Sequence, residues 1–176
     1  MAEVNARDGD GVRANRRLGL AIAAGVFVTD QLVKWVITHV ISLEARGEIH
    51  LVPFFTLRWV PNRGVSMGLL TAGSETTRWL LVGLTAAIAG FVSYWLWREK
   101  KREDTIALAF VLGGALGNIL DRVRLGYVVD FADLHFGEVH PFLVFNVGDA
   151  AITIGVLLLL VRALLTRERK PPQEEI

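Results

Sequence analysis

Four long apolar stretches dominate this chain. They cover about residues 18–41, 79–97, 105–122 and 145–165, and the second contains no charged residue. A helix rises about 1.5 Å per residue, so roughly 20 residues cross the hydrocarbon core of a bilayer. The mean hydropathy of +0.42 and the 52% share of apolar residues also exceed those of an ordinary soluble domain. The sequence therefore predicts an all-α membrane protein with four transmembrane helices.

The N-terminal segment admits two interpretations. Residues 1–17 are polar and include four arginines, so we expect a disordered tail. Residues 18–29 have the length of the apolar part of a cleaved signal peptide, but apolar sequence resumes after Asp30. We therefore favour a retained first helix. Residues 18–165 then form a single membrane domain, and residues 166–176 form a second tail.

Basic residues near the helix ends predict the orientation of the chain. The N-terminal tail, the 98–104 loop and the C-terminal tail are rich in Lys and Arg, whereas the 123–146 loop contains only Arg124. Loops with an excess of Lys and Arg stay in the cytoplasm. Both termini are therefore expected in the cytoplasm, with two loops on the outer side.

The first outer loop is predicted to be structured. Residues 49–62 mix aromatic and β-branched residues with partial alternation, which is typical of short strands. Pro53 and Pro61 restrict these strands in length or to a sheet edge. Residues 65–73 are predicted to form a short interfacial helix. The fold class is thus four transmembrane helices with a small β-platform outside the membrane.

Polar and ionisable side chains gather at the outer ends of the predicted helices. Such groups are costly inside a membrane, so each is a functional hypothesis. Residues three or four apart share one face of a helix. The group comprises Asp30 and Lys34 in the first helix, Asn118, Asp121 and Arg122 in the third, Asn146 and Asp149 in the fourth, and Asn62, Arg63 and Asp130 in the outer loops.

Two neighbouring carboxylates in this region could catalyse hydrolysis. Two such groups in a poorly solvated site share a proton. The ionised member can activate a water, and the neutral member can donate a proton to a carbonyl oxygen. The loop between Asp130 and Asp149 permits such a pair but does not demand it.

Structural roles compete with this interpretation. Asp121 and Arg122 could form an ion pair or an interfacial anchor at the helix end. Asp30 and Lys34, four residues apart, could form a salt bridge within the helix. Asp149 could instead cap its helix or interact with the helix dipole.

Three further residue patterns have more than one interpretation. Gly113 and Gly117 form a G-x-x-x-G pair, which favours close helix packing. His135, Glu138 and His140 could suggest a metal, but their spacing is better explained by a solvated loop, and we expect no metal. Lys34 with Ser66 could form a Ser–Lys peptidase pair, which no spacing supports. The absence of cysteine excludes a thiolate nucleophile.

Five sequence blocks together resemble the lipoprotein signal peptidases, also called signal peptidase II. They appear in the family's order across residues 18–165, and they read DQLVK, NRGVSMG, GGALGNILDR, GYVVDF and FNVGDAAI. One departure is Gly148, where the family usually has alanine. Glycine weakens a helix start by up to about 1 kcal/mol. It removes no reacting group.

The resemblance implies a function and a set of site residues. The catalytic pair would be Asp130 and Asp149, with no cofactor. The substrate would be a prolipoprotein whose cysteine carries a diacylglyceryl group, cut on the N-terminal side of that cysteine. The enzyme would be a monomer in the bacterial inner membrane, in contact with lipid and not with nucleic acid, and its active site would face outward. Supporting residues would be Asn62, Arg63, Gly64, Asn118, Asp121, Arg122 and Asn146, with Asp30 and Lys34 as a structural pair.

Two other functions remain open at this point. A small proton-coupled carrier would also place Asp, Lys and Arg inside the membrane, but through its whole depth. A non-catalytic assembly subunit would not depend on either outer aspartate.

Overall fold

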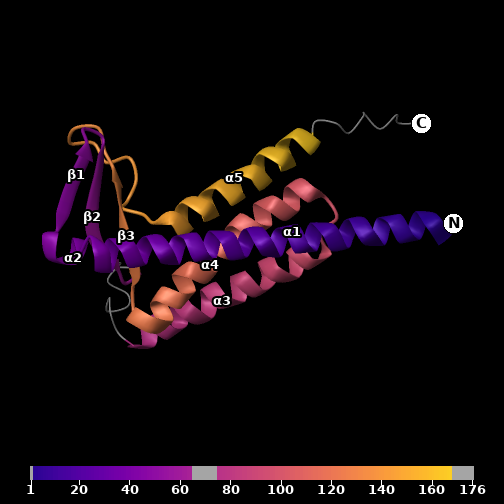
Figure 1. The fold of residues 1–176 in the computed structure, drawn as a ribbon, viewed down its shortest axis with the longest axis horizontal. Helices are drawn as coiled ribbons and strands as arrows, with labels where there is room; N and C mark the ends of the chain where they lie inside the picture. The colour runs from indigo at the N-terminus through magenta and orange to yellow at the C-terminus, as the bar shows by residue number, and fades with distance from the viewer. Residues whose placement is uncertain (1, 65–74, 168–176) are drawn as a thin grey trace, which may run out of the picture.

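The computed structural model describes residues 2–64 and 75–167, and the predicted interfacial helix at 65–73 lies outside these residues. Four long helices, α1, α3, α4 and α5, are joined at one end to a small sheet (Figure 1). A π-helical turn, η1 (Val36–Val40), extends α1, and a short helix, α2 (Leu43–Arg46), follows it. The long helices are α1 (Ala2–Trp35), α3 (Glu75–Arg98), α4 (Arg102–Leu125) and α5 (Val147–Arg167).

Helix α4 lies at the centre of the bundle and packs against the other three long helices. In the most apolar 18-residue stretch of each helix, 56% of the residues are buried in α4, compared with 22% in α1 and 17% in each of α3 and α5. The other three helices therefore present most of their apolar surface outward. All four are long and apolar enough to cross a membrane. This confirms the predicted fold class.

Glycines allow α1 and α5 to approach α4 closely. A Cβ at Gly113 would collide with the α1 backbone at Ala23, and one at Gly117 would collide with Asp30. The prediction that this glycine pair serves helix packing is therefore confirmed. On a neighbouring face of α4, a Cβ at Gly114 would collide with the Gly148 carbonyl of α5.

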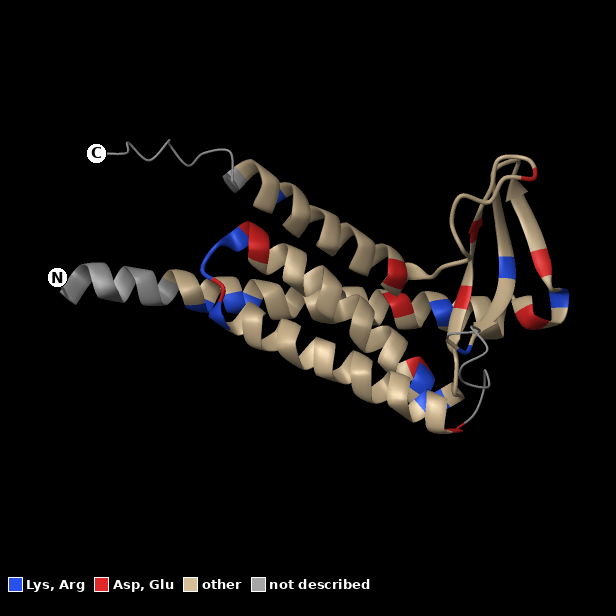
Figure 2. Cartoon of the chain, turned by 180° about the vertical axis from the view of Figure 1, so that it is seen from behind, with Lys and Arg blue, Asp and Glu red and all other residues tan. Residues whose placement is uncertain are grey.

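An antiparallel sheet closes one end of the bundle. Its order is β1 (Glu48–Val52), β2 (Phe55–Asn62), β3 (Val128–Leu134). Its apolar residues, including Leu57, Val129 and Phe131, pack with Ile37 and Leu43 into a core at the junction with the helices. The start of α1 and the end of α5 lie at the opposite end of the bundle (Figure 1). Charged residues concentrate at these two ends, and the helix segments between them are almost free of charge (Figure 2).

The structure differs from the sequence-based expectations at two places. Residues 1–17 were expected to be disordered, but α1 begins at Ala2. Arg16 lies over the Trp97 ring at 4.6 Å and donates to the Trp97 carbonyl oxygen, so this residue packs against the end of α3. Strand β3 was expected to be outer loop. It forms because residues 128–132 are buried and pair with β2.

Candidate active site

Asp130 is placed by the sheet. It lies in β3 opposite Val60 of β2 and is only 1% exposed. Side chains alternate along a strand, so Asn62, two residues beyond Val60, lies on the same face as Asp130. The Asn62 amide donates to Asp130 Oδ2 at 2.9 Å. The sheet thus holds this carboxyl group over the ends of α4 and α5.

Asp149 is placed by the first turn of α5. Asn146 immediately precedes the helix, and its side-chain oxygen accepts the Asp149 backbone N–H at 2.9 Å. In return, Asp149 Oδ2 accepts the Asn146 backbone N–H at 3.2 Å. These reciprocal bonds form a capping box. Asp149 therefore helps to cap its own helix, as one interpretation of the sequence proposed, while its other oxygen remains available to a second partner.

Two asparagine side chains link these carboxyl groups. Asn146 Nδ2 donates to Asp130 Oδ1 at 2.6 Å, and Asn118 Nδ2 donates to Asp149 Oδ1 at 2.8 Å. Asn146 Nδ2 also lies 3.2 Å from Asn118 Oδ1. The structure thus brings together Asp130 and Asp149, which are far apart in the sequence, through a short chain of amides.

Lys34 fixes the orientation of this amide chain. Its ammonium group contacts Asp30 Oδ2 and Asp121 Oδ2, each at 2.8 Å, and donates to Asn118 Oδ1 at 3.1 Å. An ammonium group has three donors and no acceptor, so all its capacity is used. Because Asn118 Oδ1 faces Lys34, the NH₂ group of Asn118 faces Asp149.

Asp30 and Asp121 hold elements together around Lys34. The predicted Asp30–Lys34 pair within α1 is present, and Asp30 Oδ1 also accepts the Gly148 backbone N–H at 2.8 Å. An ion pair between Asp121 and Arg122 was one interpretation of the sequence. Instead Asp121 pairs with Lys34 and accepts the Val129 backbone N–H at 3.2 Å. Adjacent residues on a helix point in different directions, which explains the difference.

Gly148 has a packing role that the sequence did not reveal. A Cβ at this position would lie 3.0 Å from both the Asn146 side-chain oxygen and the Gly114 carbonyl oxygen. Such contacts are tight, so glycine at this position suits the close approach of α4 and α5. The Gly148 N–H is also the donor to Asp30 described above.

The remaining predicted supporting residues surround this centre. Gly64 has a positive φ of 88°, and its N–H donates to Asn62 Oδ1 at 3.0 Å, so the Asn62 NH₂ group faces Asp130. Arg63 is exposed and lies 5.5 Å from the centre of the Tyr127 ring. Arg122 is half-buried, and its charge interacts with Asp149, Asp130 and Asp121.

Burial raises the pKa of Asp130 from its ordinary value of 3.8 to about 6. The Asn62 hydrogen bond lowers this pKa, and the negative charge of Asp149 raises it. A carboxyl group with such a pKa can exist in both protonation states near neutral pH. This is the property that acid–base chemistry requires.

The loop histidines contact the sheet, although the sequence favoured a solvated loop. His135 Nε2 lies 2.9 Å from Thr56 Oγ1, and His140 Nδ1 lies 2.9 Å from Asp133 Oδ1. Within residues 2–64 and 75–167, no three His, Asp or Glu side chains are close enough together to hold a metal ion. The other pair considered for catalysis was Lys34 with Ser66, and Ser66 lies outside the described residues.

Two polar residues near the site were missed by sequence reasoning. Gln31 donates to Asp121 Oδ1 at 3.0 Å, and its position beside Asp30 is the signal that could have revealed it. Arg78 of α3 donates to the carbonyl oxygens of Arg122 and Val123 at 2.8 and 2.6 Å. It therefore satisfies acceptors at the end of α4, and no local sequence pattern reports such a contact.

Comparison with known proteins gives a consistent result. The family model described as signal peptidase (SPase) II matches residues 22–165. A lipoprotein signal peptidase of Rhizorhabdus wittichii is 59% identical over 92% of this chain and 94% of its own length. That of Sphingopyxis alaskensis is 55% identical over 87% of this chain and 88% of its own length.

Solved structures agree at the level of the fold. A bacterial membrane enzyme structure obtained by the in meso method superposes with a TM-score of 0.72 and 28% identity, covering 84% of this chain and 92% of the other. A second such structure gives a TM-score of 0.68 and 27% identity, covering 90% and 94%. Four apolar helices and these bacterial relatives make the protein a multi-pass bacterial membrane protein. The chain belongs to the signal peptidase II family of peptidases.

Proposed function

We propose that this protein is an aspartic endopeptidase that uses Asp130 and Asp149 to hydrolyse a peptide bond. One observation supports this more than any other. Two carboxyl groups from different elements are linked through amide donors, and burial raises the pKa of Asp130 to about 6. The signal peptidase II family supports removal of the signal peptide from prolipoproteins as the reaction.

The two aspartates would divide the acid and base roles. Asp149 accepts N–H donors on both oxygens and lies at the start of a helix, so a negative charge there is stabilised. Asp149 would take a proton from the attacking water. Asp130, as the carboxylic acid, would donate its proton to the carbonyl oxygen of the scissile bond.

Collapse of the resulting tetrahedral intermediate would complete the cut. The proton that Asp149 took from water would pass to the leaving nitrogen, the C–N bond would break, and the carbonyl would re-form with return of the proton to Asp130. Arg122, whose charge already interacts with both carboxyl groups, would stabilise negative charge that develops during the reaction. Bound substrate would exclude water and raise the pKa of Asp130 further, which favours its acid role.

The substrate would be a prolipoprotein whose cysteine carries a diacylglyceryl group, cut on the N-terminal side of that cysteine. Such a substrate is held in the bilayer by its signal helix and its lipid. Asp130 and Asp149 lie at the junction of the helices and the sheet, which is where a substrate bond at the membrane boundary would be presented. Basic residues at the other end of the bundle support cytoplasmic termini and an outward-facing site.

A cleavage assay with purified protein in detergent tests this function. Wild type, Asp130→Asn and Asp149→Asn would each be given a prolipoprotein with and without its diacylglyceryl group. We expect the wild type to cut only the lipidated form, and each variant to lose at least about 100-fold in rate. Asp104→Asn is the matched control, because Asp104 pairs with Arg162 at the far end of the bundle. Near-normal turnover by either Asp130→Asn or Asp149→Asn would refute the proposal.

The carrier hypothesis has less support. A carrier needs polar groups through the depth of the bundle. The buried core between α1, α3 and α4 instead consists of apolar residues, among them Ala23, Val92, Leu96 and Leu112. Substrate flux into proteoliposomes that depends on Asp30 and Lys34, without proteolysis, would reverse this preference.

A further inference from the structure

Basic side chains gather at the end of the bundle that lies opposite the sheet. They come from the start of α1 and from the connection between α3 and α4, which are far apart in the sequence. Figure 2 shows them in blue at the end where both termini lie. All six members of this basic cluster are exposed, and they are Arg13, Arg17, Arg98, Lys100, Lys101 and Arg102.

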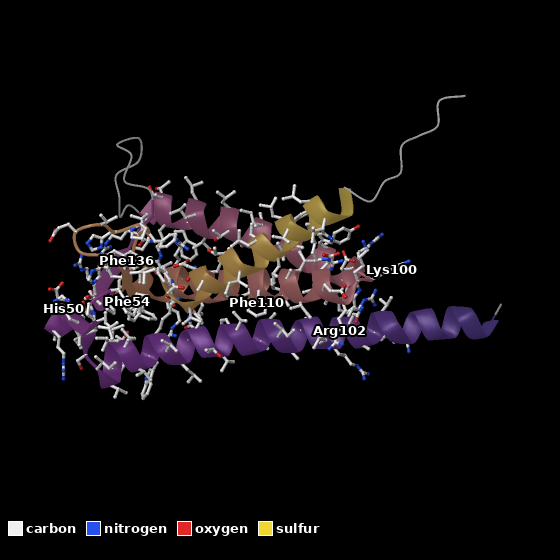
Figure 3. The ribbon with its side chains drawn as sticks, turned by 90° about the horizontal axis from the view of Figure 1, so that it is seen from above. His50, Phe54, Lys100, Arg102, Phe110 and Phe136 are labelled. Atoms are coloured by element: carbon white, nitrogen blue, oxygen red, sulfur yellow. The ribbon has the colours of Figure 1, made fainter. Side chains whose placement is uncertain are left out.

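Two hydrogen bonds from α1 hold these two segments side by side. Asn15 donates to the Lys100 carbonyl oxygen at 2.8 Å. Arg16 donates to the Trp97 carbonyl oxygen, also at 2.8 Å, and its guanidinium group lies over the Trp97 ring. Figure 3 shows Lys100 and Arg102 at this end of the bundle, beside α1 and far from the sheet. The basic cluster is therefore a feature of the packed helices.

Neighbouring acidic residues compensate only part of this positive charge. Among the side chains that the structure describes, none of the six members forms a salt bridge. Glu99 accepts the backbone N–H groups of the two residues that follow it. Glu103 and Asp104 instead contact Arg162 of α5 at 3.1 and 2.9 Å. The basic cluster therefore keeps an excess of positive charge that is open to an anionic partner.

Aromatic side chains next to the basic cluster mark the boundary of the bilayer. Tyr94, Trp95 and Trp97 are all exposed in the last turns of α3. Tyr and Trp are enriched where the hydrocarbon core of a membrane meets the headgroups. Arg98 lies 5.2 Å from the centre of the Tyr94 ring, directly where the membrane-spanning helix ends. The basic cluster thus lies at the depth of the lipid headgroups.

We propose that the basic cluster binds the phosphate of an anionic phospholipid in the leaflet at this end of the bundle. A lipid phosphate carries negative charge and accepts hydrogen bonds, and Lys and Arg side chains supply charged donors. Basic residues next to a membrane-spanning helix are attracted to anionic leaflets for this reason. A headgroup held between α1 and the α3–α4 connection would join these segments in addition to the bonds of Asn15 and Arg16. This inference does not depend on the peptidase activity.

The surroundings of the basic cluster favour a lipid over a free phosphate or a nucleic acid. Exposed aromatic side chains border the cluster, and α3 presents most of its apolar surface outward from there toward the other end of the bundle. A phospholipid matches this order, because its acyl chains continue from its phosphate into the bilayer. A free phosphate would use only the charge of the cluster. A nucleic acid would have to lie against the membrane boundary.

The double variant Lys100→Gln/Lys101→Gln tests the proposal. Both side chains are exposed, so the variant should unfold in detergent at the same temperature as the wild type. Native mass spectrometry would measure how the purified full chain binds phosphatidylglycerol and phosphatidylcholine with identical acyl chains. We expect the wild type to prefer phosphatidylglycerol. The double variant should bind phosphatidylglycerol at least about tenfold more weakly, because each Lys near an anionic surface contributes to the attraction.

Arg46→Gln/Arg124→Gln is the matched control. It removes the same amount of charge from exposed residues at the sheet end of the bundle. This control should bind phosphatidylglycerol as tightly as the wild type. An equal loss of binding in the two double variants would overturn the proposal, because the attraction would then depend on total charge alone. Equal binding of the two lipids by the wild type would also overturn it.

Thermal unfolding of the wild type in detergent distinguishes a lipid from other anions, and it does not depend on how any variant folds. Phosphatidylglycerol should raise the unfolding temperature, whereas inorganic phosphate or a short DNA oligonucleotide at the same concentration should not. A rise with inorganic phosphate equal to that with phosphatidylglycerol would assign the basic cluster to a free anion. A rise with the oligonucleotide alone would assign it to a nucleic acid. Either result would overturn the lipid proposal.

Discussion

Two pairs of carboxyl groups lie at the same end of the bundle, and they are balanced in different ways. Asp30, Asp121 and Asp130 are buried, and Asp149 is half-buried. Asp30 and Asp121 each contact the ammonium group of Lys34 at 2.8 Å. Asp130 and Asp149 receive amide N–H donors instead, and within residues 2–64 and 75–167 neither forms an ion pair. The two pairs are linked, because Asn118 bonds to both Lys34 and Asp149.

This difference separates a structural pair, Asp30 and Asp121, from the pair that we propose to be reactive, Asp130 and Asp149. A cation between two carboxylates compensates their charge, and the resulting cluster joins α1 to α4. Amide donors orient a carboxyl group without adding a positive charge, so much of the cost of ionising it in a buried place remains. In the proposed mechanism Asp130 of the second pair would keep a proton that it can transfer, and the first pair would provide the rigid frame beside it.

Removing the cation of the structural pair should have the largest effect on stability. Lys34→Met leaves Asp30 and Asp121 buried without their common partner. The expected loss is about 3–5 kcal/mol of unfolding free energy, and it should appear as a lower unfolding temperature in detergent. The readout is tryptophan fluorescence during heating.

A double substitution provides the control for that prediction. Adding Asp121→Asn to Lys34→Met removes one of the uncompensated charges and should recover part of the loss. An unchanged unfolding temperature in Lys34→Met would show that the cluster does not stabilise the fold. Recovery would identify charge balance, rather than side-chain volume, as the cause.

The reactive pair should respond in the opposite sense. The raised pKa of Asp130 means that its ionised form destabilises the folded protein. This cost is absent below the ordinary pKa of 3.8 and fully present above about 6. Asp130→Asn should therefore stabilise the protein by on the order of 1 kcal/mol at about pH 8 and give no gain at about pH 4.

Unfolding temperatures of wild type and Asp130→Asn, measured at both pH values, check this prediction. The variant should be inactive and yet at least as stable as the wild type above pH 6. A loss of stability at the higher pH would show that Asp130 belongs with the structural carboxylates. The comparison between the two pairs would then fail.

The helices were predictable from sequence because their signal is local. Apolar stretches of bilayer length predict membrane-spanning helices whatever tertiary contacts those helices make. The spacing of Asp30 and Lys34 likewise predicts their contact within one helix. The polar residues of the site were also predictable as a group, because charge is so costly in a membrane.

The partners of those residues were not predictable from local pattern. Asp121 lies beside Arg122 in the sequence, but the packing of α1 on α4 gives it Lys34. The strand around Asp130 depends on pairing with a segment about 70 residues earlier, as the register of Val60 with Asp130 shows. Such contacts are set by tertiary structure, and a single sequence does not contain the distance information that would reveal them.

The smallest expected effect concerns the donor that tunes Asp130. The Asn62 hydrogen bond lowers the pKa of Asp130, so Asn62→Ala should raise it. If Asp130 acts as the acid, kcat/KM of the wild type falls as pH rises above about 6, because the proton is lost. In Asn62→Ala this falling limb should move to higher pH by roughly half a unit. The matched control is Asn15→Ala, since Asn15 donates to the Lys100 carbonyl at the other end of the bundle. A limb that stays in place or moves to lower pH would show that the Asn62 amide does not lower the pKa of Asp130.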